Sequence, residues 1–214
     1  ALASALAQAE VAEVVVVDDG SSDGTAAAAH ACDDGSGRLR ILSQANGGPS
    51  LARNLGVRAV TSPAWCILDA DDLFEAGRLG RLLSQGGEDW DMLSDGIRFA
   101  AADGSGHEIR PVIGAARELT LAEFVRGNIP RRNAPRRELG FLQPLMRTAF
   151  FRDNGLEFDV TLRLAEDYAL FSEALALGAR FRAVDAVGYV ANITPGSLTH
   201  VHGPEDFDVL VDFD

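Results

Sequence analysis

The chain of 214 residues contains no lysine, so all 19 of its basic residues are arginines. Against them stand 32 acidic residues, which gives a net charge of -13. A surface that binds nucleic acid needs clustered positive charge to neutralise phosphates, so nucleic acid is not an expected partner. The absence of lysine also excludes every mechanism that requires a lysine amine.

Cysteines and long apolar runs are scarce as well. Cys32 and Cys66 are the only two cysteines, and their separation matches no metal or redox motif. No run approaches the about 20 apolar residues that a membrane-spanning helix needs, and the first residues do not have the pattern of a signal peptide. We therefore expect a cytoplasmic protein. The arginine-rich stretch 131–137 could give peripheral contact with the inner face of the plasma membrane, although such stretches are usually solvated loops.

Apolar and helical patterns alternate along the first half of the chain, which is typical of a parallel sheet covered on both faces. The hydrophobic content of 47% is enough for one domain with a sizeable core. In the helix expected near 50–60, Leu51, Leu55 and Ala59 have helical spacing. The expected strands are 11–17, 39–42, 65–68 and 91–94, and the expected helices are 25–32, 50–60 and 75–84.

Acidic residues follow two of these strands, and in such a sheet they would meet at the edge where ligands bind. Asp69 and Asp71 are two positions apart, so at a strand end their side chains would project to one side. This arrangement could hold Mg²⁺ or Mn²⁺ against a diphosphate. The alternative is that residues 69–72 form an ordinary capped turn.

The first acidic pair and an arginine could bind the rest of a nucleotide. Asp18 and Asp19 can accept hydrogen bonds from a base or from ribose hydroxyls. Arg53, just beyond the Gly47-Gly48 turn, could reach a base carbonyl or a phosphate. The alternative for Asp18 and Asp19 is helix capping. The alternative for Arg53 is a surface ion pair.

A second acidic pair, Glu166-Asp167, opens an expected helix around residues 164–175. A carboxylate at the positive end of a helix keeps a low pKa unless it is buried. It could act as a general base only if the fold brings the substrate within hydrogen-bond reach. The alternative is the ordinary preference of acidic residues for a first helical turn. His200 and His202 could complete a metal site or be solvated.

Four segments occur in an informative order: VVVVDDGSSDGT, QANGGPSLARNLGV, CILDADD and LRLAEDYALF. Together they resemble the inverting family 2 glycosyltransferases over about residues 1–200. The sequence segments 140–151 and 162–175 resemble those of bacterial exopolysaccharide enzymes of the succinoglycan type. The resemblance implies a GT-A α/β fold, with a Rossmann-like, mostly parallel sheet flanked by helices. A single domain, 1–214, would then comprise a nucleotide-sugar-binding half (1–95) and a mixed acceptor-binding half (96–214).

The resemblance also implies roles for individual residues of the donor site. Asp18 or Asp19 would bind the nucleobase, and Arg53 would assist it. Asp69 would contact the ribose, and Asp71 would ligate Mn²⁺ or Mg²⁺. The implied donor is a nucleotide sugar, most simply a UDP-hexose.

The same resemblance assigns the acidic pair of the second half to catalysis. Asp167 would be the general base that deprotonates the acceptor hydroxyl, and Glu166 would position the acceptor. The acceptor implied is a saccharide or a polyprenyl-linked saccharide.

Two departures from the family pattern stand out. The chain begins at ALASALAQAE, which matches the helix after the family's first strand, so that strand is expected to be absent and a sheet edge exposed. In addition, Tyr189 is followed by Val190 rather than by arginine.

Three other functions share parts of these patterns. A receiver domain also pairs aspartates at a strand end, but it uses a lysine. A haloacid-dehalogenase-like phosphatase uses an Asp-x-Asp motif, but on its first strand and followed by threonine or valine. The third is a non-catalytic module that binds nucleotide sugars, which the absence of the first strand would favour.

Overall fold

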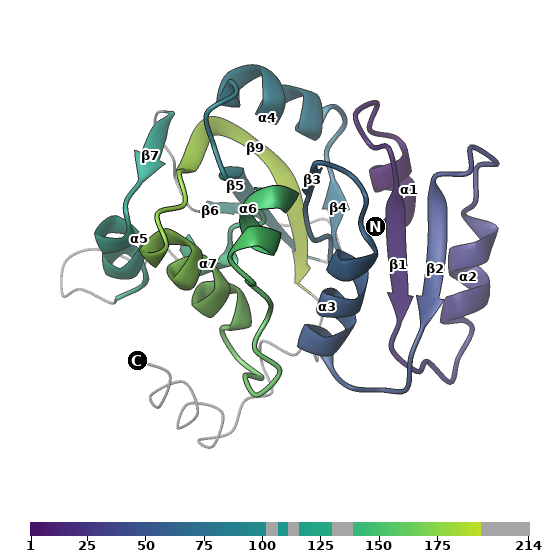
Figure 1. Cartoon of the computed structure of the whole chain (residues 1–214). Coiled ribbons are helices and arrows are strands. Elements are labelled where there is room, and N and C mark those ends of the chain that lie inside the picture. The colour runs from purple at the N-terminus through teal and green to yellow at the C-terminus, as the bar shows by residue number, and fades with distance from the viewer. Residues whose placement is uncertain (102–106, 111–115, 130–138, 194–214) are drawn as a thin grey trace.

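The computed structural model describes residues 1–101, 107–110, 116–129 and 139–193 (Figure 1). The arginine-rich stretch, the Asp103-Gly104 turn, His200 and His202 lie outside these residues. The helices are α1 (Leu2–Leu6), α2 (Thr25–Ala31), α3 (Pro49–Ala59), α4 (Arg78–Gly86), α5 (Leu121–Asn128), α6 (Thr148–Asp153) and α7 (Glu166–Ala176), with a 3-10 turn, η1 (Leu139–Phe141). The strands are β1 (Val14–Asp18), β2 (Leu39–Ser43), β3 (Ala64–Trp65), β4 (Leu73–Phe74), β5 (Met92–Ala101), β6 (His107–Arg110), β7 (Arg117–Leu119), β8 (Leu145–Arg147) and β9 (Phe181–Ile193).

The strands form one parallel and one mixed sheet, so the expectation of a mostly parallel sheet is wrong for the larger of the two. β1 and β2 form a parallel pair, and the larger sheet has the order β3-β8-β5-β9-β4, with β6 on β5 and β7 on β9. Within the larger sheet only β5 and β9 are parallel among the described strands. The expected strand 65–68 is reduced to β3, which pairs in antiparallel fashion with β8 from the second half. Local periodicity identifies a strand but does not reveal a partner some eighty residues away.

A cavity of about 950 Å³ separates β1 from residues 64–68, where the two sheets fail to join. Its walls include the valines 14–17 of β1 and the apolar residues 64–68, and Arg53 and Asp69 also line it. That the family's first strand is absent from this sequence stays a prediction. The cavity shows that the donor half lies beside an unfilled apolar space.

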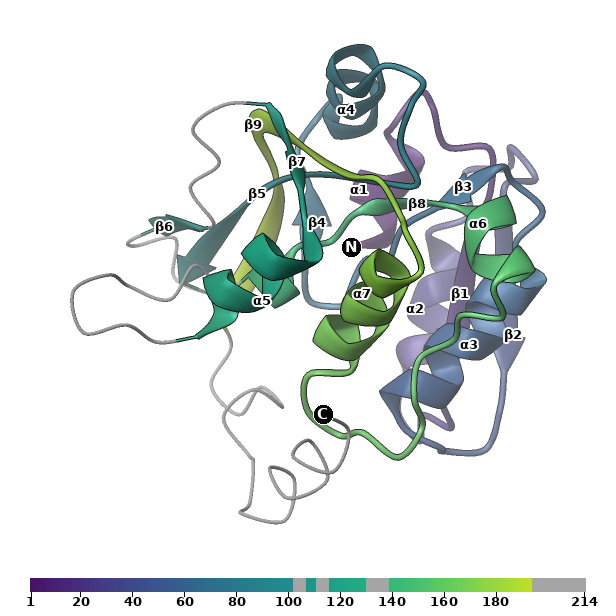
Figure 2. The same ribbon diagram turned by 60° about the vertical axis from the view of Figure 1, so that its left-hand side comes forward.

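The main core lies between the larger sheet and the helices of the second half. Phe124 on α5 stacks on Tyr168 of α7 at 5.5 Å between ring centroids, and its edge-to-face partner Phe171 lies at 6.3 Å. Aromatic pairs of this geometry add about 0.5–1.5 kcal/mol beyond the area they bury. Figure 2 shows that α7 lies between α5 and α3. The first turn of α7 therefore faces the donor half.

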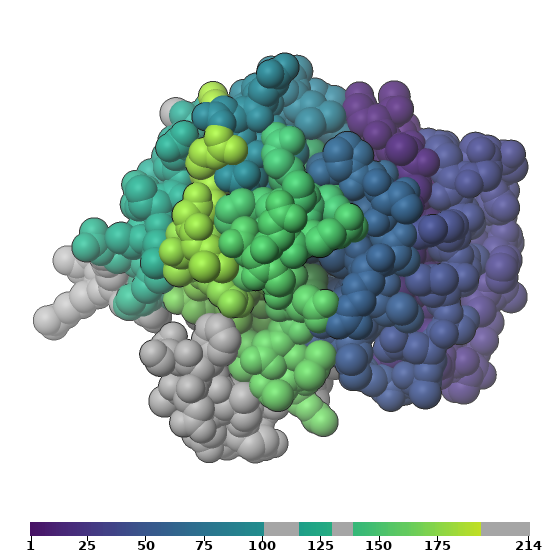
Figure 3. All heavy atoms as spheres, viewed as in Figure 1, coloured from purple at the N-terminus to yellow at the C-terminus, as the bar shows by residue number. Residues whose placement is uncertain are grey.

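Polar contacts tie α3 to the segment before α7, in addition to Val57, which packs against the main core. Leu51 is exposed, whereas Asn54 is buried and bonds both backbone groups of Phe158, each at 2.8 Å. Arg58 adds an ion pair with Glu157. The space-filling view shows α3 packed directly against this segment (Figure 3). The contact fixes the distance between the two halves of the chain.

We expect Asn54→Ala to lower the free energy of unfolding by about 2–6 kcal/mol, because two buried backbone groups each lose a partner at about 1–3 kcal/mol. Urea titration followed by circular dichroism measures this change. Asn154→Ala is the matched control, since Asn154 makes a single exposed hydrogen bond, to Phe150. Equal destabilisation by the two variants would contradict the structural role of Asn54.

Within the described part of the chain, none of the helices has the length and apolar character that crossing a bilayer requires.

Candidate active site

Asp19, at the end of β1, organises the glycine-rich turn that precedes α3. Its carboxylate accepts hydrogen bonds from Gln44 Nε2 at 2.7 Å, Gly47 N at 2.8 Å and Gly48 N at 2.9 Å. The Gln44 contact, followed by the two backbone contacts, lowers the pKa of Asp19 despite some desolvation. Gly48 has a φ of 88°, a conformation that favours glycine. Asp19 is thus an ionised carboxylate that shapes the turn, and its contact with a nucleobase stays a prediction.

Asp18 does not cap α2. Its Oδ1 accepts the backbone N–H of Ser21 at 3.0 Å inside the turn. α2 begins after Gly24 without a side-chain cap, and Asp23 instead accepts both donors of Thr25. The capping alternative for Asp18 is therefore wrong, and its side chain stays half-buried at the end of β1.

Arg53 is the residue that joins the separate acidic motifs. From α3, its guanidinium donates to Asp69 Oδ1 at 3.1 Å and to Glu166, and it lies 3.8 Å from Asp167 Oδ1. The group also lies over the ring of Phe158, 5.4 Å from its centroid. Burial disfavours its charge, but the attraction of Asp167, Asp69 and Glu166 outweighs this and raises the pKa of Arg53. A permanent positive charge therefore stands between the donor motif and the second-half acidic pair.

The carboxyl of Asp167 has a raised pKa. Burial raises its pKa to about 7, with Arg53 opposing this shift and Glu166 and Asp69 adding to it. The side chain is 18% exposed, and its Oδ1 has no hydrogen-bond partner among the described residues. The low pKa expected of a helix N-terminus is overridden, because desolvation outweighs the helix dipole here.

The backbone before this acidic pair is strained in a way that the sequence did not reveal. Ala165 has a φ of 62°, and it is the one non-glycine residue with positive φ among those described. For an alanine this conformation costs about 1–2 kcal/mol. Such strain persists where the surrounding structure requires it, often at functional sites. Here it sets the direction in which Glu166 and Asp167 leave the chain.

The three aspartates of the segment 69–72 differ in burial: Asp72 is buried, Asp69 is half-buried and Asp71 is exposed. Asp72 is buried, and it accepts hydrogen bonds from the hydroxyl of Tyr189 at 2.7 Å and from the backbone of Asn192 at 2.8 Å. Burial raises the pKa of Asp72 to about 6, although both hydrogen bonds oppose the shift. The Tyr189 hydroxyl also accepts the backbone N–H of Asp69 at 3.2 Å. Tyr189, which the sequence marked only as a family departure, therefore holds this turn in place.

Asp69 and Asp71 could form a metal site only together with oxygen atoms of a bound substrate. Asp71 is exposed, and Asp69 already contacts Arg53. The described residues contain no cluster of three or more potential metal-ligating side chains. Mg²⁺ and Mn²⁺ are commonly held by one or two carboxylates plus substrate phosphates, and the residues present fit that kind of site. In such a site the phosphates of the donor would supply further oxygen ligands.

The structure thus brings together Arg53, Asp69, Glu166 and Asp167, which lie up to 114 positions apart in sequence. Asp19 anchors the turn leading into the helix that carries Arg53. A fixed cation beside a half-buried carboxylate of raised pKa suits proton abstraction next to a negatively charged donor.

Comparison with known proteins identifies the family of the chain. The family described as Glycosyl transferase family 2 matches residues 1–152. The succinoglycan biosynthesis proteins ExoU and ExoO of Rhizobium meliloti (strain 1021) are 47% and 34% identical, over 100% and 99% of this chain. The chain spans 63% and 61% of their respective lengths.

Solved structures show the same fold. Staphylococcus aureus TarS in complex with UDP-GlcNAc superposes with a TM-score of 0.74 at 23% identity, covering 98% of this chain and 59% of that one. The family match also removes the receiver and phosphatase alternatives. The chain belongs to glycosyltransferase family 2 and has a GT-A-like α/β fold.

Proposed function

We propose that this chain is the catalytic part of an inverting glycosyltransferase that moves a hexose from a UDP-sugar to a saccharide or lipid-linked saccharide. The observation that supports it most is the bridge made by Arg53 between Asp69 and Asp167. It places a candidate donor contact and a candidate base around one cation. The relatives named for succinoglycan biosynthesis support a role in exopolysaccharide synthesis, and TarS was crystallised with a UDP-sugar.

In the proposed donor site the nucleotide lies at the ends of β1 and of residues 64–68. Asp18 or Asp19 binds the base, Asp69 contacts the ribose, and Arg53 holds the surrounding carboxylates in place. Asp71 would ligate Mn²⁺ or Mg²⁺, and the cation would offset the charge that develops on the departing diphosphate.

In the proposed transfer step the acceptor oxygen attacks the anomeric carbon from the face opposite UDP. Asp167 takes the hydroxyl proton as the new C–O bond forms, and the bond from the anomeric carbon to the diphosphate breaks with its electrons leaving on UDP. Glu166 positions the acceptor. A single attack from the opposite face inverts the configuration. A lipid-linked acceptor would bring the cytoplasmic protein to the inner face of the plasma membrane.

The raised pKa of Asp167 predicts the pH dependence of transfer. Because only the ionised carboxylate accepts a proton, kcat should fall about tenfold per pH unit below about 7 and level off above it. The same ionisation affects folding stability in the opposite direction: kcat rises with pH, whereas the contribution of Asp167 to stability falls. Since the folded-state pKa exceeds the ordinary value of 3.8, the contribution of Asp167 to stability is lost as pH rises from 3.8 to about 7.

Initial rates measured between pH 5 and pH 9 at saturating donor test this prediction, with unfolding free energies measured over the same range. A rate that is flat between pH 5 and pH 8 would rule out a base with this pKa.

A non-catalytic module that binds nucleotide sugars is the second candidate, and the cavity beside β1 favours it because the donor half is incompletely packed. Isothermal titration with UDP and Mn²⁺, alongside an assay for sugar release, separates the two. Binding accompanied by release or transfer supports the enzyme, whereas tight binding without either supports the module.

A further inference from the structure

Strand β9 holds the turn that carries the candidate donor residues. The hydroxyl of Tyr189 donates a hydrogen bond to Asp72 Oδ2 at 2.7 Å and accepts the backbone N–H of Asp69 at 3.2 Å. Further along β9, Asn192 donates its backbone N–H to Asp72 Oδ1 at 2.8 Å and its side-chain amide to the carbonyl oxygen of Asp71. Two residues of one strand thus bond all three aspartates of the turn.

The turn has a short connection to the rest of the fold. One backbone hydrogen bond, from Asp72 N to Asp69 O at 3.1 Å, closes it. The strand that follows, β4, consists of two residues, and both pair with β9. The position of the turn therefore depends on β9 twice, through this pairing and through the side chains of Tyr189 and Asn192.

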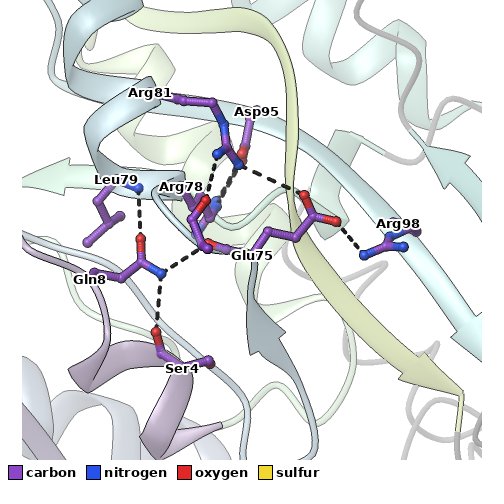
Figure 4. A network of polar contacts seen from close by, with 9 residues as sticks. Ser4, Gln8, Glu75, Arg78, Leu79, Arg81, Asp95 and Arg98 are labelled. Carbon is purple, nitrogen blue, oxygen red and sulfur yellow. Dashed lines mark hydrogen bonds and ion pairs between the residues drawn. The ribbon is translucent and has the colours of Figure 1, made fainter.

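A buried ion pair fixes the part of β9 that carries Tyr189. Arg78 and Asp95 are both fully buried and share a forked contact, with Nε at 3.0 Å and Nη2 at 2.8 Å from Asp95 Oδ1 (Figure 4). The Arg78 guanidinium lies 5.3 Å from the centroid of the Tyr189 ring. A Cβ added at Gly188 would lie 2.6 Å from Arg78, so the strand and the ion pair are in close contact. Packing of this density limits the movement of the Tyr189 ring and hydroxyl.

A dication bound by Asp71 would require precise placement of that carboxylate. Mg²⁺ takes oxygen ligands at about 2.0–2.1 Å in near-ideal octahedral geometry. Asp71 is exposed, so the position of its backbone sets where the carboxylate begins. The amide of Asn192 bonds the carbonyl of this residue, and Tyr189 bonds the backbone N–H of Asp69, two positions before it. The contacts from β9 therefore hold the two backbone positions from which the candidate donor ligands extend.

We propose that Tyr189 and Asn192 are positioning residues for the donor site, which hold the backbone of residues 69–72 so that Asp69 meets the ribose and Asp71 meets the cation on the diphosphate. This inference rests on the proposed function, which gives Asp69 and Asp71 these roles. Neither positioning residue touches the donor, and both act through the turn. Supporting contacts behind metal ligands change metal affinity or activity by about 10–100-fold when they are removed.

The test compares the Kd for UDP in Mn²⁺ with the Kd for UDP in EDTA, both measured on the full chain by isothermal titration. Tyr189→Phe removes the hydroxyl and keeps the ring beside Arg78. Asn192→Ala removes the amide that bonds Asp71 and keeps the backbone N–H that bonds Asp72.

Each variant has a control with the same chemical change elsewhere. Tyr168→Phe removes the hydroxyl of the only other tyrosine, on α7. Asn154→Ala removes a side-chain amide that makes a single exposed hydrogen bond, to Phe150. Thermal unfolding of all four variants identifies those that are folded.

We expect Tyr189→Phe and Asn192→Ala each to lower the ratio of the Kd in EDTA to the Kd in Mn²⁺ by about tenfold, because the Asp71 carboxylate is displaced from the cation. Partial unfolding weakens binding in both buffers, so a purely structural role would leave the ratio unchanged. Both controls should keep the ratio of the unmodified chain. An unchanged ratio in folded Tyr189→Phe and folded Asn192→Ala would overturn the proposal.

These outcomes are distinct from failure of the proposed function. If the unmodified chain binds UDP equally in Mn²⁺ and in EDTA, the proposed donor site is wrong and the positioning role falls with it. If the unmodified chain shows the Mn²⁺ effect and both β9 variants keep it in full, only the positioning role is lost.

Discussion

Replacing Asp167 by asparagine should reduce kcat for sugar transfer by about 10²–10⁴-fold, the usual contribution of a general base. Asparagine keeps the size of the side chain but cannot accept the acceptor proton at neutral pH. Donor binding should stay within about threefold, because Asp69, Arg53 and Asp71 are untouched. Steady-state rates and calorimetric titration of UDP-sugar measure the two quantities in one preparation.

The control is Asp153→Asn, which makes the same chemical change on the exposed end of α6 and should keep full kcat. Loss of Arg53 attraction in Asp167→Asn could disturb the site, so the melting temperature is measured for both variants. Full turnover by folded Asp167→Asn would mean that another group takes the proton.

Replacing Asp71 by alanine should abolish the metal-dependent part of donor binding. We expect UDP affinity in Mn²⁺ to fall at least about 100-fold, or about 2.8 kcal/mol, toward the value measured with chelator. The physical reason is that a cation bridging protein and diphosphate loses its protein carboxylate. Titration of UDP with Mn²⁺ and with EDTA gives the difference directly.

Asp185→Ala is the matched control, because it removes one exposed negative charge far along β9 from the turn and leaves the same net charge as Asp71→Ala. Its Mn²⁺ dependence should equal that of the unmodified chain. If Asp71→Ala keeps the full Mn²⁺ effect, the ligand lies elsewhere.

Local pattern predicted much of the donor half. The valine run before Asp18, the break at Gly47-Gly48 and the acidic start of α7 are signals carried by neighbouring residues, and the structure confirms a strand, a turn and a helix there. What failed depends on distant contacts. The segment 66–68 is apolar enough for a strand, but only β3 finds a partner, in β8.

The site was predictable as a set of motifs but not as a geometry. For Arg53 the sequence left two alternatives, a nucleotide contact and a surface ion pair. The structure shows ion pairs with three carboxylates at a part-buried position, and the nucleotide contact stays a prediction. Asp72 has the same residue type as Asp69 and Asp71, yet only the fold shows that it is buried against Tyr189.

Inverting transfer at this site is tested by the anomer first released from a UDP-α-hexose. Proton NMR during early turnover, with water or a saccharide as acceptor, distinguishes the two configurations before mutarotation. We expect the β anomer to form first, and we expect Asp167→Asn to abolish formation of this product. An α anomer formed first would contradict the proposed single attack from the face opposite UDP.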